Sequence, residues 1–142
     1  MVILVQATRD ADAYGELARR HQASLRAFLW RLTADAGRAE DLAQDALLAG
    51  YRNVDRFEGA ASFRTWLFAI AYRGFLHGRR KAGVISRLIE AVKREPAPAA
   101  AAQADMSLDI QRALARLEPK ERAALLLCDA CGMSHSEASE AM

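Results

Sequence analysis

Residues 62–75 read SFRTWLFAIAYRGF, and this stretch decides the fold class. Its apolar residues recur at steps of three and four, which is the period of an α-helix and not of a strand. Ser62 precedes them, and serine caps helices by accepting hydrogen bonds from free backbone amides. We therefore expect a helix from Ser62 to about Lys81. The residues expected to face inward are Phe63, Trp66, Leu67, Ile70, Ala71, Gly74 and Phe75.

Two earlier segments have the same period. Asp10 or Asp12 is placed to cap a helix whose apolar residues extend over 14–32, and the sequence DAG at 35–37 interrupts it. A further helix is predicted from about Arg38 to Val54. The polar face of this helix carries Glu40, Asp41, Gln44, Asp45 and Leu48.

A linker divides the second half of the chain. A weaker helical pattern follows Gly83, and residues 95–102 then read EPAPAAAA. Prolines, small residues and weak periodicity are typical of a connection between domains. Short helices are predicted from Ser107 and from 119 to 130, and a last helix is predicted to start at Ser134 or Ser136.

Length and composition fit two small helical domains. The chain has 142 residues, of which 52% are hydrophobic and 27% charged, so a packed core is expected. No run alternates apolar with polar residues over the length of a strand. The sequence therefore predicts an all-α protein.

Charge is segregated along the chain. Residues 1–58 carry 8 Arg and Lys against 9 Asp and Glu, residues 59–94 carry 8 against 1, and residues 95–142 carry 4 against 8. A basic block between two mildly acidic ones is typical of a surface that binds nucleic-acid phosphates. The alternative is an ordinary solvated helix face.

Several classes of protein are excluded by the sequence. No stretch approaches the length of a membrane span, and the apolar start at 1–5 lacks the basic flank of a secretory signal. Two cysteines are too few for a disulfide scaffold. No phosphate-binding loop, nucleophile elbow or carboxylate pair indicates an enzyme. We expect a cytoplasmic, non-enzymatic protein that does not insert into membranes and has no cofactor.

Cys128 and Cys131 have C-x-x-C spacing, with His135 four positions further on. A structural zinc site needs four ligands, and no second pair is present. Buried small hydrophobic residues are the favoured interpretation, with a metal site or a redox-sensing thiol pair as alternatives.

Three strings in order resemble one family. Residues 39–46 read AEDLAQDA, the stretch at 62–72 is followed by Arg79-Arg80, and LARL at 114–117 is followed by Pro119, ERA and GMS. Together these strings resemble the extracytoplasmic-function sigma factors of bacterial RNA polymerase. The resemblance implies sigma region 2, a three-helix bundle, over residues 8–82, a linker over 83–106, and an incomplete sigma region 4 over 107–142.

The resemblance also implies partners. The helix at 38–54 would dock on the clamp helices of the largest subunit of core RNA polymerase. The residues implied at this contact are Asp41, Gln44, Asp45 and Leu48.

Promoter DNA would be bound by the following loop and helix, which open the duplex and trap unstacked bases. The residues implied are Phe57, Ser62, Arg64, Arg73, His77, Arg79, Arg80 and Lys81. Trp66 and Tyr72 are further available aromatics, but Trp66 is on the inward stripe, which favours a place in the core. Arg73 and His77 stand where the family commonly has Asn and Asp. The family's preference for particular DNA bases is therefore not assigned to this chain.

The family continues through a complete helix-turn-helix, whereas this chain stops near its first helix. As it stands, the chain is not expected to read the upstream promoter element. The favoured function is a sigma factor restrained by an anti-sigma factor. The alternatives are a non-productive helical module that binds polymerase or an anti-sigma factor and, more distantly, a helix-turn-helix repressor.

Overall fold

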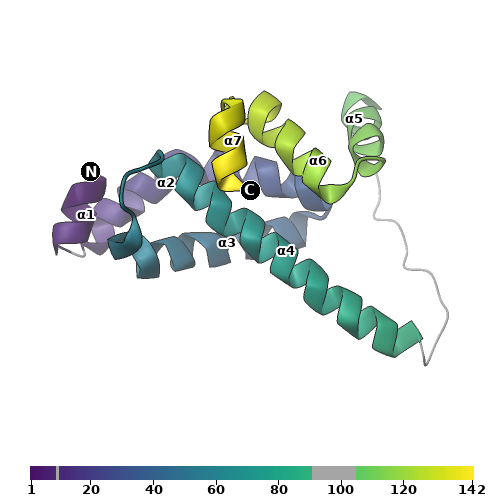
Figure 1. The fold of residues 1–142 in the computed structure, drawn as a ribbon, viewed down its shortest axis with the longest axis horizontal. Helices are drawn as coiled ribbons and strands as arrows, with labels where there is room; N and C mark the ends of the chain where they lie inside the picture. The colour runs from purple at the N-terminus through teal and green to yellow at the C-terminus, as the bar shows by residue number, and fades with distance from the viewer. Residues whose placement is uncertain (9, 91–104) are drawn as a thin grey trace.

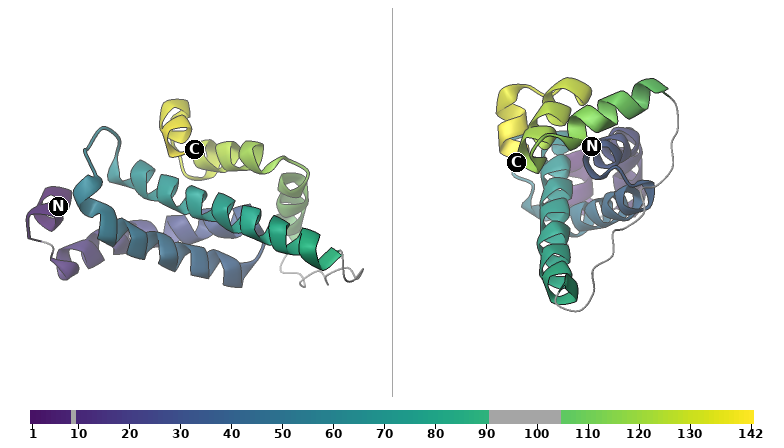
Figure 2. Two further views of the ribbon diagram at one scale, coloured as in Figure 1. Left: turned by 60° about the horizontal axis from the view of Figure 1, so that its bottom comes forward. Right: turned by 90° about the vertical axis from the view of Figure 1, so that its right-hand side faces the viewer.

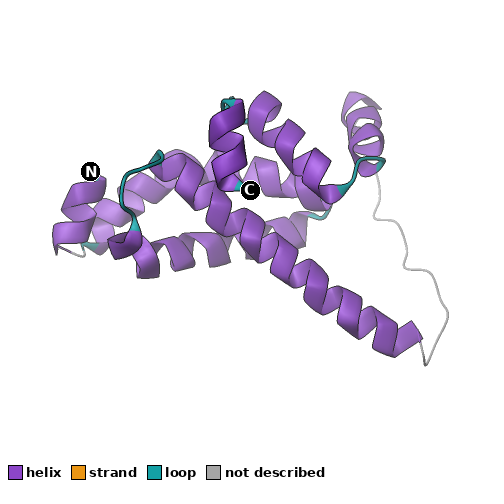
Figure 3. Cartoon of the chain, in the orientation of Figure 1, coloured by secondary structure: helices purple, strands orange, loops and turns teal. Residues whose placement is uncertain are grey.

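The computed structural model describes residues 1–8, 10–90 and 105–142, without the side chains of 86–90 and 105–108. Regular structure in these ranges is helical throughout, and they contain no strand (Figure 3). The predicted all-α fold is therefore confirmed, whereas the EPAPAAAA segment at 95–102 lies outside the described residues. The helices are α1 (Val2–Thr8), α2 (Ala11–Thr33), α3 (Ala36–Asn53), η1 (Val54–Arg56), α4 (Phe63–Glu90), α5 (Asp105–Ala115), α6 (Pro119–Leu125), η2 (Leu126–Ala130) and α7 (His135–Ala141).

Aspartate caps start the first two long helices. The Asp10 carboxylate accepts hydrogen bonds from the amides of Asp12 (2.8 Å) and Ala13 (3.4 Å), which starts α2. Helix α2 ends at Thr33, and the next residue, Ala34, has a left-handed backbone (φ 55°). Asp35 then accepts from the Arg38 amide at 2.9 Å and caps α3. The helix predicted from near Arg38 therefore begins two residues earlier, because one left-handed residue follows α2 and the next residue already caps α3.

Helix α1 was not predicted. Its Val5 side chain is 0% exposed, whereas Ile3 is 80% exposed. A helix of seven residues is too short to be stable alone, so α1 depends on its contacts with α2 and η1. The sequence pattern misses it because the stability comes from distant residues and not from a repeated period.

Helices α2, α3 and α4 form a three-helix bundle, and its core consists mostly of the predicted stripes. Leu25, Phe28, Leu29, Leu67 and Phe68 are each at most 1% exposed. The rings of Phe28 and Phe68 lie 5.3 Å apart between their centroids. Burying one such side chain contributes roughly 1.5–3 kcal/mol relative to leaving it exposed. The contact between Phe28 and Phe68 therefore stabilises the packing of α2 against α4.

A close contact between α2 and α3 requires a glycine. The Tyr14 hydroxyl donates a hydrogen bond to the Leu47 carbonyl at 2.6 Å, and the Tyr14 ring is buried. Burial raises the pKa of Tyr14 to about 12. A Cβ atom at Gly50 would lie 2.5 Å from the Tyr14 hydroxyl and 3.3 Å from a methyl carbon of Leu67. Only glycine leaves room for this hydrogen bond.

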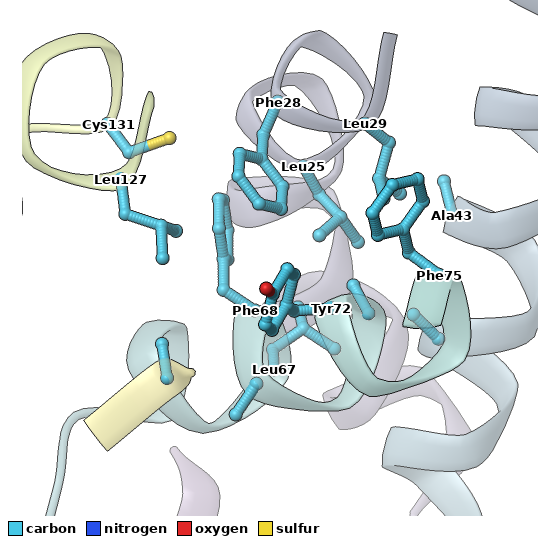
Figure 4. Packing of buried hydrophobic residues seen from close by; sticks show 14 of the residues in the cluster. Leu25, Phe28, Leu29, Ala43, Leu67, Phe68, Tyr72, Phe75, Leu127 and Cys131 are labelled. Carbon is cyan, nitrogen blue, oxygen red and sulfur yellow. The ribbon is translucent and has the colours of Figure 1, made fainter. Parts of the chain in front are cut away.

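The C-terminal helices form a second layer across α2 and α4. Figure 1 shows α7 lying across α4, with α6 beside it. Leu127 and Cys131 point toward Phe28 and Phe68 of the bundle (Figure 4). The Arg64 guanidinium donates to the Cys131 carbonyl. The two predicted helical regions are thus docked on one another.

Arg122 of α6 joins this second layer to the bundle. Its guanidinium donates to the carbonyls of Leu114 (2.7 Å), Leu117 (3.2 Å) and Leu32 (3.0 Å). Leu32 belongs to α2. The Arg122 side chain therefore forms hydrogen bonds with the end of α5, with the following turn and with the bundle.

Helix α4 is longer than predicted. It was expected to end near Lys81 but continues through Gly83 to Glu90. A glycine inside a helix costs only about 1 kcal/mol relative to alanine, which does not stop a long helix. The C-terminal end of α4 projects away from the bundle, as Figure 1 and the right-hand view of Figure 2 show, and Val84 and Ile85 are 58% and 45% exposed.

The tight contact at Gly50 gives a stability prediction. Gly50→Ala places a methyl group against the Tyr14 hydroxyl and is expected to lower the free energy of unfolding by about 1–3 kcal/mol. Gly15→Ala is the matched control, since its added Cβ meets only the tip of Arg19 at 3.8 Å. The control is expected to raise stability by roughly 0.5–1 kcal/mol through its higher helix propensity. Urea unfolding followed by circular dichroism measures both, and an equal effect of the two substitutions would contradict the packing argument.

The Arg122 contact gives a second prediction. Arg122→Met leaves the three carbonyls without this donor and is expected to cost about 2 kcal/mol. Because Cys131 is only 6% exposed in the docked layer, its thiol should then react faster with an aromatic disulfide reagent. The rate is measured with Cys128→Ala as background. Arg116→Met, which removes an exposed side chain just after α5, should leave both stability and labelling rate unchanged.

Candidate functional site

An exposed stripe on α3 carries the residues implied in polymerase binding. Positions 41, 44, 45 and 48 fall on one side of a helix with 3.6 residues per turn. Asp41, Gln44 and Asp45 are exposed, and Leu48 is 53% exposed. Within the described part of the chain, neither Asp41 nor Asp45 has a hydrogen-bond or ion-pair partner. The stripe therefore presents free carboxylates beside one apolar side chain.

Glu40 borders this stripe but is engaged within the bundle. The Arg26 guanidinium donates to both Glu40 oxygens, at 2.7 and 3.1 Å, and Gln44 donates to one of them at 3.1 Å. These hydrogen bonds, with that from Arg26 the largest cause, hold the pKa of the Glu40 carboxyl below its usual value. The ion pair between Arg26 and Glu40 fixes which side of α3 faces α2. The stripe with Asp41 and Asp45 therefore faces outward.

The basic residues of α4 do not form one surface. A helical residue advances about 100° around the axis, so Arg73, His77 and Arg80 share one face with Ser62 and Trp66. Arg73, His77, Arg80 and Lys81 are all exposed. This face is the part of α4 left open by its packing against α2, α3 and α7.

Arg64 and Arg79 lie on the other side of α4. Arg64 is half-buried, donates to the Cys131 carbonyl, and places its guanidinium 5.6 Å from the centroid of the Phe68 ring. Arg79 is exposed and lies 5.8 Å from the centroid of the Phe75 ring. In this arrangement Arg64 belongs to the contact between the two helical layers and is not grouped with Arg73.

A cavity of about 220 Å³ opens between the loop after η1 and α4. The Phe57 and Trp66 rings meet edge to face on one side of it, with centroids 5.4 Å apart. Gly59 adopts a left-handed conformation (φ 75°), which bends the loop around the cavity. Arg73 and Glu140 also line it, so the cavity is bordered by aromatic rings and by charges of both signs.

Gln6 supports this loop and was missed from the sequence. Its side-chain amide donates to the carbonyls of Val54 (2.9 Å) and Phe57 (2.7 Å). No local pattern indicates this contact, because the partners are 48 and 51 positions away.

Tyr72 is not available to bases. It was predicted among the accessible aromatics, but it is 2% exposed because the C-terminal layer covers it. Trp66 is half-buried beside the cavity, and Phe57 is half-buried as well.

Cys131 is buried and Cys128 is half-buried, as expected for small hydrophobic residues. Burial raises the pKa of the Cys131 thiol. Cys128 and His135 line a separate cavity of about 530 Å³ between α4, α6 and α7. Over the residues described, no cluster of three or more His, Cys, Asp or Glu side chains has the arrangement of a metal site. In the same residues, no helix combines the length and apolar character needed to cross a membrane.

Comparison with known families identifies both layers. The sequence profile of Sigma-70 region 2 matches residues 17–84, which include the three-helix bundle from Leu17 onward. The profile of Sigma-70 region 4 matches residues 107–142, which include most of the C-terminal layer.

Similar proteins of known class are sigma factors. The ECF RNA polymerase sigma factor SigE of Mycolicibacterium smegmatis is 33% identical over 141 residues, which cover 92% of this chain and 54% of SigE. The RNA polymerase sigma factor NccH of Alcaligenes xylosoxydans xylosoxydans is 30% identical, over 94% of this chain and 76% of NccH. The chain thus spans little more than half the length of SigE.

A solved structure has the same arrangement of helices. The sigma factor RpoE from Bartonella quintana, crystallised with the anti-sigma factor NepR, matches with a TM-score of 0.77 at 29% identity. The match covers 92% of this chain and 83% of RpoE. Sequence and fold agree, and the chain belongs to the extracytoplasmic-function sigma factors of the sigma-70 family.

Proposed function

We propose that this chain binds core RNA polymerase through α3 and directs promoter recognition and DNA melting through the loop after η1 and the exposed face of α4. The observation that carries the proposal is the separation of two charged surfaces on one bundle. Free carboxylates project from α3, and exposed cations project from α4, where Arg73 lines a cavity with aromatic walls.

The α3 stripe suits a basic protein partner. Asp41 and Asp45 are exposed and have no partner within the described residues, so they can pair with cations without breaking existing bonds. Leu48 adds an apolar contact at the same stripe, and interfaces commonly combine an apolar centre with charged edges. In sigma factors the corresponding helix meets the clamp helices of the largest polymerase subunit, and we propose the same contact here.

The α4 face and the loop suit DNA whose bases have left the stack. Arg73, Arg80 and Lys81 supply charge for phosphates, and His77 adds a polar group to the same face. Phe57 and Trp66 offer ring edges at the cavity, where an unstacked base can be held. Ser62 lies at the start of this face, while Arg64 and Arg79 would reach DNA only from the other side of α4.

The remaining assignments follow from the family. We propose residues 8–82 as region 2, 83–106 as a linker, and 107–142 as part of region 4. The factor acts in the cytoplasm and catalyses no reaction itself. RpoE of Bartonella quintana was crystallised with an anti-sigma factor, and we propose a helical inhibitor of this kind as a further partner.

Charge reversal on α3 tests the polymerase contact. Asp41→Arg with Asp45→Arg places like charges against the partner and should weaken binding to core RNA polymerase by about 100-fold or more. Asp12→Arg with Asp129→Arg makes the same charge change at other exposed positions and should have little effect. Fluorescence anisotropy of the labelled chain with purified core enzyme measures both. Equal losses for the two double variants would refute a specific role of the α3 stripe.

Removal of charge from α4 tests the nucleic-acid surface. Arg73→Ala with Arg80→Ala should weaken binding to random-sequence single-stranded DNA, and the dependence of affinity on salt should become shallower by roughly 1–1.5 in the slope of log K against log salt concentration. Arg112→Ala with Arg116→Ala removes the same charge from the C-terminal layer and should leave the slope unchanged. An unchanged slope for the α4 pair would contradict the proposed surface.

A further inference from the structure

We infer that Gln6 is a positioning residue for promoter recognition: it holds the loop after η1 in the form that lines the base-binding cavity. The inference rests on the proposed function. Its basis is the pair of hydrogen bonds from the Gln6 amide nitrogen to the carbonyls of Val54 and Phe57, at 2.9 and 2.7 Å.

These two carbonyls bracket the point where regular structure ends. Helix η1 ends at Arg56, and the Phe57 backbone amide donates a hydrogen bond to the Val54 carbonyl at 3.0 Å. Phe57 itself has an extended backbone, so its carbonyl can no longer bond within a helix. A primary amide carries two N–H groups on one nitrogen, which lets Gln6 donate to both carbonyls at once. Gln6 therefore fixes the direction in which the chain leaves η1.

Helix α1 holds Gln6 in place. Val5, the preceding residue, is 0% exposed and anchors α1 to the bundle, and α1 contacts both α2 and η1. The Gln6 side chain is itself half-buried. Because its helix is anchored by a neighbouring residue, the amide needs little further ordering to reach both carbonyls.

Phe57, one of the two residues that Gln6 holds, lines the cavity. The Phe57 ring packs against Phe63 and Trp66, with centroids 5.9 and 5.4 Å away, and residues 56–61 form the outer wall of the cavity. A shift of the Phe57 backbone would move this ring and the bend at Gly59 together. Gln6 lies outside residues 17–84, so the region 2 profile does not include it.

The test separates base discrimination from the other interactions of the chain. A pool of duplex DNA with a randomised unpaired segment is enriched with core polymerase and the unsubstituted chain. The affinity for enriched DNA relative to the starting pool then measures discrimination. Gln6→Met keeps the length of the side chain without the donor, and Gln6→Glu turns an acceptor toward the two carbonyls.

Both variants are expected to lose discrimination by about tenfold, which corresponds to one or two hydrogen bonds. Core polymerase affinity and binding to the unselected pool should change less than twofold. Ile3→Glu is the matched control, because it adds a charge to the same helix at a position that is 80% exposed, and it should behave like the unsubstituted chain.

Each contrary outcome has a distinct meaning. Unchanged discrimination in both Gln6 variants would overturn the inference and leave the proposed function intact. A parallel loss of core polymerase affinity would also overturn it, since Gln6 would then only stabilise the bundle. Failure of the unsubstituted chain to enrich any DNA would refute the proposed function, and the inference with it, before any variant is compared.

Discussion

Helix α4 packs on two sides at once, and the rest of the molecule depends on this constraint. One side of α4, with Phe63 and Leu67, faces α2 and α3. Phe68 and Tyr72 also pack against residues of the C-terminal layer (Figure 4). Only a narrow face stays open to solvent within the bundle. Because an unpaired buried charge is very costly, cations on this part of α4 are confined to that face or engaged as Arg64 is. The basic surface is thus a consequence of how the helix packs.

A chain of aromatic contacts connects the core to the loop. Tyr14 and Phe63 meet with centroids 6.3 Å apart, Phe63 and Trp66 at 5.6 Å, and Trp66 and Phe57 at 5.4 Å. Each ring is held by its neighbours, and Tyr14 is held by its bond to Leu47. The loop that lines the cavity is therefore held by the packed rings, through Phe57, and by the two hydrogen bonds from Gln6.

Local patterns in the sequence predicted the helices of the bundle, because period and capping depend on residues close together in the chain. Asp10, Ser62 and Ser134 each cap a helix by accepting from nearby amides. The stripe on α3 followed from the same period. Other contacts involve partners about fifty or more positions away. These are the burial of Tyr72, the hydrogen bond from Arg64 to the Cys131 carbonyl, and the hydrogen bonds of Gln6. No period marks such contacts. The helical period does, however, place Arg64 and Arg79 on the opposite side of α4 from Arg73.

The α3 and α4 surfaces can act independently because of how charges are screened. At about 0.1 M salt, interactions between exposed charges fall off over roughly 10 Å. Glu40, the acid that borders the α3 stripe, is already paired with Arg26, so it adds little to the field of the free carboxylates. The cations of α4 lie on a different helix, and Arg73 lines the cavity beside the loop. A single small bundle can therefore present an acidic surface to one macromolecule and a basic surface to another, and neither surface needs to neutralise the other for the fold to be stable.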